Sequence, residues 1–173
     1  MTPIPIIGRF SDIASQTPWF VTVACLLAFS AVAWDFDRLI GRMQQSHGAS
    51  APRLVQDWQG VLAASRNLGE EDKLRRINEF FNRRIRYDED SRIWRQNDYW
   101  ATPLEMIGKG TGDCEDFSIA KYFSLREAGI AREKLRLTYV RAQLGGSSSG
   151  IVQAHMVLAY YASPNAEPLV LDN

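Results

Sequence analysis

The chain has 173 residues, 46% of them hydrophobic, which is enough for one domain with a sizeable buried core. Its 20 basic and 20 acidic residues cancel, so the composition offers no electrostatic footprint for nucleic acid and no polybasic signal for a membrane surface. We therefore expect protein or peptide partners and no nucleic-acid binding.

The first 33 residues have the pattern of a secretory signal peptide. Residues 18–34 are apolar and uncharged, Arg9 lies upstream, and Ala31-Val32-Ala33 fits a small-x-small cleavage site. The apolar run falls short of the about 20 residues that span a bilayer. We expect export to the periplasm, with an uncleaved inner-membrane anchor as the alternative. A lipid anchor on Cys25 is disfavoured, because the apolar run continues beyond it.

Residues 34–51 are interpreted as a linker and residues 52–173 as the folded domain. Cleavage of the signal would remove Cys25 and leave Cys114 as the only cysteine. Such a thiol has no intramolecular disulfide partner in an oxidising compartment, so it is either buried and inert or chemically active. The acidic, polar neighbours of Cys114 favour the active interpretation.

Hydrophobic spacing predicts two helices at the start of the domain, over Pro52–Leu68 and Glu70–Ile85. Residues 87–100 are aromatic and polar without a period, and we interpret them as a loop that packs near the site. A short helical turn over Leu104–Ile107 then leads into the glycine-rich residues 108–112. Their spacing is not that of a P-loop, so we expect the glycines to permit a tight turn close to a substrate.

A further helix is expected to begin at Cys114 and to end at Gly129. Its inner face would consist of Phe117, Ala120, Ser124 and Ala128. A thiol at a helix N-terminus lies at the positive end of the helix dipole, which lowers its pKa and populates the thiolate. This placement suits a nucleophile.

The C-terminal third changes to a strand-like pattern. Strands are predicted over Leu135–Leu144 and Ile151–Tyr161, joined by a glycine- and serine-rich loop, and a third short strand over Leu169–Leu171. The predicted fold class is therefore α+β, with N-terminal helices first and the cysteine-bearing helix packed on an antiparallel sheet.

Three residues in this layout have the chemistry of an activated nucleophile. Cys114, His155 and Asp172 provide a thiol, an imidazole that accepts its proton, and a carboxylate that holds the imidazole in one tautomer. Only one of Asp172 and Asn173 can face His155, because adjacent strand residues point to opposite sides. We choose Asp172 and predict a cysteine hydrolase.

Four sequence blocks together resemble the bacterial transglutaminase-like cysteine proteases, and the resemblance covers roughly residues 52–173. The blocks are Trp100-Ala101-Thr102-Pro103-Leu104-Glu105, residues 112–122 (GDCEDFSIAKY), Ala154-His155-Met156-Val157-Leu158 and Leu169-Val170-Leu171-Asp172-Asn173. The resemblance implies a papain-like, transglutaminase-like fold with Cys114, His155 and Asp172 as the triad. It also implies a large secreted adhesin as substrate, cut near its N-terminus at a dialanine site. Release of the adhesin would disperse a biofilm, and a LapD-like inner-membrane cyclic-di-GMP receptor would sequester the protease.

The carboxylates around the cysteine suggest a metal site. Asp113, Glu115 and Asp116 offer hard oxygen ligands of the kind that calcium prefers, although carboxylates at this position can also cap the helix. The resemblance implies calcium dependence through this acidic segment, so we expect Ca2+ as a structural cofactor. Asn97, Asp98 or nearby backbone could complete the shell.

Two alternatives to the protease remain open. The same triad could transfer the acyl group to an amine, as in a transglutaminase or an amidase. A different class is a non-catalytic, secreted calcium-binding adaptor with a vestigial triad. The sequence ends one residue after Asp172, whereas domains of this family usually continue with further strand structure, so a truncated C-terminus would weaken the hold on that carboxylate.

Overall fold

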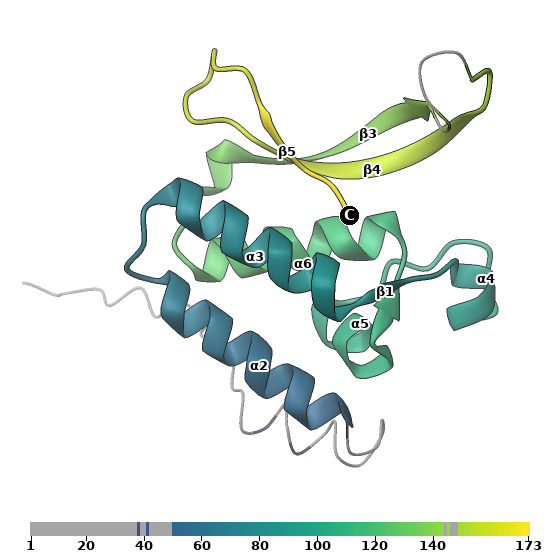
Figure 1. Cartoon of the computed structure of the whole chain (residues 1–173), viewed down its shortest axis with the longest axis horizontal. Coiled ribbons are helices and arrows are strands. Elements are labelled where there is room, and N and C mark those ends of the chain that lie inside the picture. The colour runs from purple at the N-terminus through teal and green to yellow at the C-terminus, as the bar shows by residue number, and fades with distance from the viewer. Residues whose placement is uncertain (1–37, 39–40, 42–49, 144, 146–148) are drawn as a thin grey trace, which may run out of the picture. The chain divides into compact units, whose positions relative to one another are not determined.

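The computed structural model describes residues 38, 41, 50–143, 145 and 149–173 (Figure 1). The predicted signal peptide, including Cys25, lies outside the described residues, and so does most of the predicted linker at 34–51. Within the described part of the chain, no helix has both the length and the hydrophobicity needed to cross a membrane.

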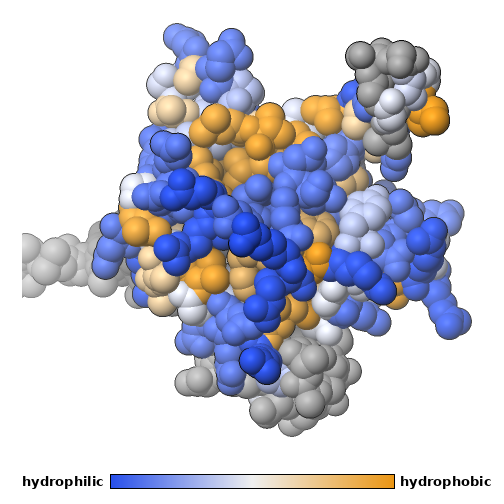
Figure 2. Space-filling view, viewed as in Figure 1, coloured by the Kyte–Doolittle hydropathy of each residue, from blue (hydrophilic) through white to orange (hydrophobic). Residues whose placement is uncertain are grey.

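The two helices predicted at the start of the domain are present as α2 (Ser50–Ser65) and α3 (Glu70–Arg84). Helix α3 has three acidic residues in its first turn and Arg83 and Arg84 in its last, which matches the helix dipole at both ends. Its outward face is hydrophilic in Figure 2, while Leu74, Ile77, Phe80 and Phe81 are buried on the opposite side.

The chain between α3 and the cysteine contains more regular structure than predicted. Four short elements are present: β1 (Arg86–Tyr87), α4 (Asp90–Ile93), α5 (Pro103–Lys109) and β2 (Thr111–Gly112). The predicted loop at 87–100 thus contains α4, and β1 pairs with β2 in parallel. Helix α5 begins at a capping box, in which Thr102 and Glu105 bond each other's backbone N–H groups. Two-residue strands have no hydrophobic period, so the sequence pattern could not predict them.

Helix α6 (Cys114–Glu127) confirms the predicted cysteine helix. Asp113 caps its first turn by accepting a hydrogen bond from the backbone N–H of Asp116. Gly129 follows with φ 91°, a left-handed backbone conformation that residues with a Cβ rarely adopt. The helix therefore ends where the sequence predicted. A short 3-10 turn, η1 (Arg132–Lys134), then leads into the sheet.

The sheet has three antiparallel strands in the order β3 (Leu135–Gln143), β4 (Val152–Tyr160) and β5 (Leu169–Leu171). Leu158 of the central strand lies opposite Leu137 on one side and Leu171 on the other. The strand predictions are therefore confirmed to within one residue at each end. Helices come first and α6 packs against this antiparallel sheet, so the α+β prediction is confirmed.

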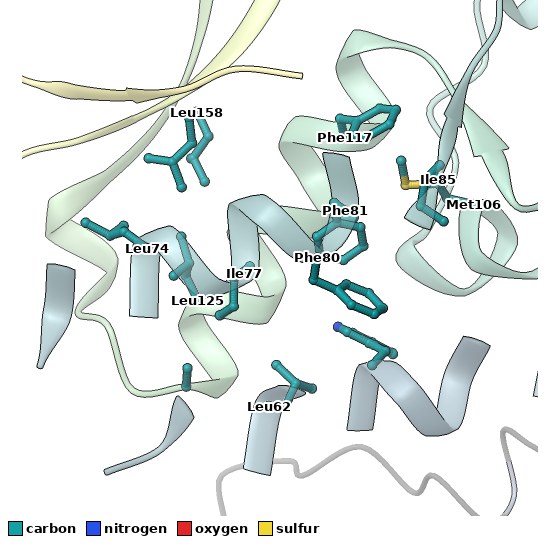
Figure 3. Close-up of a cluster of buried hydrophobic side chains, with 14 of the residues drawn as sticks. Leu62, Leu74, Ile77, Phe80, Phe81, Ile85, Met106, Phe117, Leu125 and Leu158 are labelled. Carbon is teal, nitrogen blue, oxygen red and sulfur yellow. The ribbon is translucent and has the colours of Figure 1, made fainter. Parts of the chain in front are cut away.

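Hydrophobic side chains from the helices and the sheet form one core (Figure 3). Phe81 and Ile77 of α3 are fully buried, as are Leu125 of α6 and Leu158 of β4. Trp58 of α2 is also fully buried, and its indole N–H donates to Ser124 Oγ of α6 at 2.9 Å. This core fixes α6, which carries the cysteine, against the strand that carries the histidine and the strand that ends just before the aspartate.

Candidate active site

Helix α6 lies against the strand that carries the histidine. Ser118, one turn after Cys114, donates a hydrogen bond from Oγ to the backbone carbonyl of Met156 at 3.1 Å. Met156 follows His155 on β4, and burial raises the pKa of the Cys114 thiol, while the backbone N–H of Met156 lies near enough to oppose part of that rise. The cysteine and the histidine strand are therefore held together at the start of α6.

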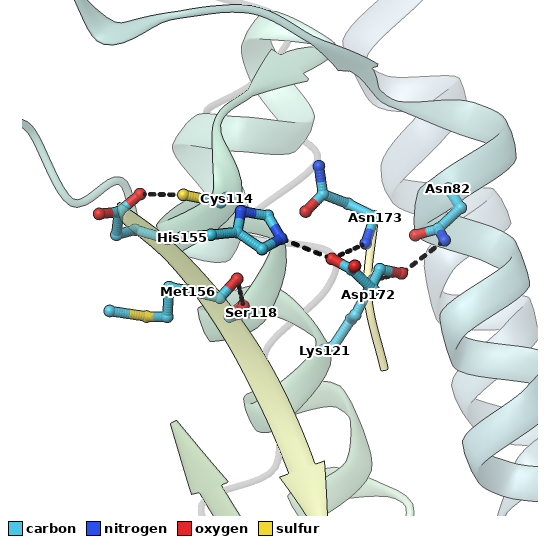
Figure 4. Close-up of polar contacts among 9 residues, drawn as sticks. Asn82, Cys114, Ser118, Lys121, His155, Met156, Asp172 and Asn173 are labelled. Atoms are coloured by element: carbon cyan, nitrogen blue, oxygen red, sulfur yellow. Dashed lines mark hydrogen bonds and ion pairs between the residues drawn. The ribbon is translucent and has the colours of Figure 1, made fainter. Parts of the chain in front are cut away.

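His155 and Asp172 form a direct pair. The Nε2 atom of His155 lies 2.7 Å from Oδ1 of Asp172, which also accepts the backbone N–H of Asn173 at 2.9 Å. Figure 4 shows the imidazole with Nε2 toward Asp172 and its other nitrogen on the side of Cys114. A cleft of about 570 Å³ opens beside the pair, lined also by Tyr87, Glu89, Ala142, Gln143, Gln153 and Asn173.

The thiol of Cys114 donates a hydrogen bond to the carboxylate of Glu115 rather than to the imidazole of His155. Its Sγ lies 2.7 Å from Oε2 of Glu115, and in the described structure no hydrogen bond joins it to His155. Burial and the bond to Glu115 raise the pKa of the thiol to about 12. The expectation that the helix dipole would lower this pKa is wrong for this structure, because burial and nearby carboxylates outweigh the dipole.

Three other carboxylates form a cluster at the start of α6. Asp90, Asp113 and Asp116 each place one oxygen within 4.8 Å of the others. Asp116 is fully buried and accepts the backbone N–H of Ala101 at 2.7 Å through Oδ1. Its Oδ2 and the Oδ1 of Asp90 are buried without a hydrogen-bond partner. Two buried carboxyl oxygens without hydrogen-bond partners are costly unless a cation satisfies them.

The cluster differs from the ligand set expected from the sequence. Glu115 is not brought to Asp113 and Asp116, since its two oxygens accept hydrogen bonds from Cys114 and from Tyr139. Asp90 takes its place, from the short helix α4 in a segment expected to be a loop. Of the two residues suggested to complete the shell, Asp98 lies near enough for its charge to raise the pKa of Asp90.

Burial and mutual repulsion raise the pKa of each carboxyl group in this cluster. Burial, followed by the charges of Asp116 and Glu115, raises the pKa of Asp113 to about 7. Burial likewise raises the pKa of Asp116 to about 6 and is the main cause of the raised pKa of Asp90. Carboxylates that repel one another in this way favour a divalent cation, and the donor set consists of the hard oxygens that suit calcium.

A glycine makes the close packing of the cluster possible. A Cβ added to Gly112 would lie 2.9 Å from Cβ and Oδ2 of Asp116. The glycine-rich segment before the cysteine therefore brings backbone close to a side chain of the acidic cluster, rather than only turning the chain.

Comparison with known proteins places these residues in a family. Residues 57–173 match the model of the bacterial transglutaminase-like cysteine proteinases (BTLCP). The chain belongs to this family. The resemblance seen in the sequence is therefore confirmed, and the protein is a member of a family of cysteine proteinases. No curated protein matches the sequence.

Solved structures of LapG from Legionella pneumophila share the fold. LapG of that organism is 34% identical with a TM-score of 0.66, over 81% of this chain and 73% of the LapG chain. EGTA-treated LapG is also 34% identical, with a TM-score of 0.66 over 81% and 71% of the two chains. Calcium-bound LapG is 36% identical, with a TM-score of 0.65 over 79% and 71%. The chain has a LapG-like transglutaminase fold.

Proposed function

We propose that this protein is a calcium-dependent cysteine endopeptidase in which Cys114 is the nucleophile, His155 the general base and Asp172 the residue that orients the base. The observation that carries the proposal is the 2.7 Å contact between His155 Nε2 and Asp172 Oδ1, beside the cysteine of α6, in a BTLCP chain. A thiol, an imidazole and a carboxylate in this order form a catalytic unit for acyl transfer.

The imidazole has a defined role because of the atom that Asp172 contacts. A carboxylate at Nε2 favours the tautomer with the proton on Nε2, which leaves Nδ1 free to accept the proton of the thiol. Figure 4 places that second nitrogen on the side of Cys114. The thiol must turn from Glu115 to His155 before this transfer takes place.

The reaction then proceeds in two halves. The sulfur of Cys114 attacks the scissile carbonyl as its proton moves to His155, and the backbone N–H of Cys114 at the start of α6 stabilises the oxyanion. The imidazolium returns the proton to the leaving amine, which departs and leaves a thioester. His155 then takes a proton from water, the hydroxide displaces the sulfur, and the acid product leaves with the thiol restored.

Calcium would be held by the acidic cluster. Asp90, Asp113 and Asp116 supply the oxygens, and the two unpartnered oxygens of Asp90 and Asp116 support the fit. Calcium-bound LapG further supports this choice of ion. When bound, the ion would neutralise the clustered charge at the start of α6. Its role is structural, because the thiol itself supplies the nucleophile.

The biological setting of the proposal comes from the sequence resemblance. The substrate is a large secreted adhesin cut near its N-terminus at a dialanine site, and its release promotes biofilm dispersal. The enzyme acts in the periplasm after export by its N-terminal signal. A LapD-like inner-membrane cyclic-di-GMP receptor is the partner that sequesters it.

The test is cleavage of an adhesin N-terminal fragment that contains a dialanine site. We expect cleavage with calcium, little cleavage after EGTA treatment, and none of a fragment whose dialanine is replaced. An added primary amine separates proteolysis from acyl transfer, because a transglutaminase would attach the amine to the acyl product. A chain that binds calcium but cuts no fragment would instead support the adaptor alternative.

A further inference from the structure

A buried lysine contacts the backbone of the proposed triad aspartate. Lys121 of α6 is fully buried, and its Nζ donates a hydrogen bond to the backbone carbonyl of Asp172 at 2.8 Å. The ring of Phe117 lies 5.5 Å from the same nitrogen. Lysine is among the residues least often buried, and removing its amine from water costs free energy that a methionine of similar length would not incur.

A second side chain donates to the same carbonyl from another helix. Asn82 of α3 places its Nδ2 2.7 Å from the oxygen of Asp172, so α3 and α6 both hold this one carbonyl (Figure 4). A carbonyl oxygen has two lone pairs, and both are used here.

The lysine also lies on the same face of α6 as the proposed nucleophile. Cys114, Ser118 and Lys121 are spaced by four and then three residues, so they share one face of α6. Ser118 bonds the carbonyl of Met156, next to His155, and Lys121 bonds the carbonyl of Asp172. One helix face thus carries the thiol and fixes the two backbone segments that carry the other members of the proposed triad.

We propose that Lys121 is a positioning residue of the catalytic unit, which together with Asn82 holds the backbone of Asp172 so that its carboxylate meets His155. Burial lowers the pKa of Lys121 to about 7, and the amine can donate to a carbonyl whether or not it is charged. The inference rests on the proposed triad, but it concerns a contact that can be measured without any substrate.

The experiment follows the imidazole proton of His155 by NMR in the full chain. The sequence has only two histidines, His47 and His155, so a His47→Gln variant assigns the signals. Lys121→Met should broaden or remove the Nε2–H signal of His155 through faster exchange with water. Asn82→Ala alters an exposed side chain and tests the same contact if the lysine variant folds poorly. Lys73→Met, at a buried lysine of α3, is the matched control and should leave the signal unchanged.

Cleavage of the dialanine fragment gives the second readout. Lys121→Met should lower kcat roughly 10- to 100-fold with KM unchanged, as expected when a catalytic group is misplaced. Combined with Asp172→Asn it should cost nothing further, since both changes disable the same unit. An unchanged His155 signal in both Lys121→Met and Asn82→Ala, or losses that multiply with Asp172→Asn, would overturn the inference. A wild-type chain that cuts nothing would refute the proposed function, while the NMR comparison would still decide the role of Lys121.

Discussion

The thiol of Cys114 donates a hydrogen bond to the carboxylate of its neighbour Glu115, across 2.7 Å between Sγ and Oε2. The other oxygen of Glu115 accepts the hydroxyl of Tyr139 at 3.1 Å, so the carboxylate is held in this orientation by the edge strand β3. The contact keeps the proton on sulfur and away from His155.

Removing the charge of Glu115 should activate the thiol. Burial is the largest cause of the raised pKa of Cys114, and the hydrogen bond and charge of Glu115 come next among the causes that raise it. Glu115→Gln should therefore lower this pKa, and iodoacetamide should alkylate the metal-free variant faster than metal-free wild type near neutral pH. Glu133→Gln, in the exposed turn η1, is the control. Equal rates in Glu115→Gln and wild type would show that this carboxylate does not restrain the thiol.

The metal-free protein should lose stability as the pH rises toward neutrality. The pKa is raised from 3.8 to about 7 in Asp113 and to about 6 in Asp116. At a pH between the ordinary value and these raised values, the folded chain therefore binds more protons than the unfolded chain. The free energy of unfolding is then greatest at a pH below the pKa that these two aspartates have in the unfolded chain. It falls as the pH rises through the pKa values that they have in the folded chain. Calcium binds the deprotonated carboxylates, so it should restore the loss and release protons. Thermal unfolding at about pH 5 and about pH 7.5, with and without calcium, measures this.

The ligands of the ion can be identified by single substitutions. Asp90→Asn and Asp116→Asn should each abolish the rise in melting temperature that calcium gives to the wild type, because they remove charge from the cluster. Glu115→Gln should retain this rise, since its side chain lies outside the cluster. Calorimetric titration checks the result. If Glu115→Gln lost calcium uptake while Asp90→Asn retained it, the result would contradict this assignment. It would instead support the ligand set expected from the sequence, which includes Glu115 and not Asp90.

Adding one methyl group to Gly112 should disturb the cluster. The new Cβ would lie 2.9 Å from Asp116 and 3.0 Å from Cγ of Met106, so Gly112→Ala should cost about 1–3 kcal/mol of stability and weaken calcium binding. Gly60→Ala is the control, because Gly60 is exposed in α2 with nothing within 4 Å of its added Cβ. That change should stabilise the chain by about 0.5–1 kcal/mol. Denaturant unfolding measures the change in stability of both variants. If Gly112→Ala and Gly60→Ala both stabilised or both destabilised the chain, the result would contradict this account.

The long elements could be predicted because each presents a periodic hydrophobic face. Helix α6 and strands β3 and β4 were predicted to within two residues, and so was the placement of Cys114 at the start of a helix. The short parallel pair β1 and β2 has too few residues to show a period. Its existence depends on tertiary contacts that no local pattern records.

The site could be predicted in its chemistry but not in its full membership. Cys114, His155 and Asp172 were predicted because their residue types form a known unit, and the structure pairs the last two. Asp90 was missed because it lies 23 residues before Asp113 and joins the cluster only through the fold. Lys121 was missed because a lysine in a helix is normally exposed, and burial of its amine depends on the sheet packed above it.

The most direct test of the central claim is the cleavage rate of the calcium-loaded protein on the dialanine fragment, in Cys114→Ala, His155→Ala and the double variant. Members of one catalytic unit are not additive, so each single variant should lose essentially all cleavage and the double variant should lose no more. Circular dichroism should show that all three remain folded, because Cys114→Ala removes only the sulfur. Cleavage close to the wild-type rate in either folded single variant would contradict the assignment of these residues as a catalytic pair.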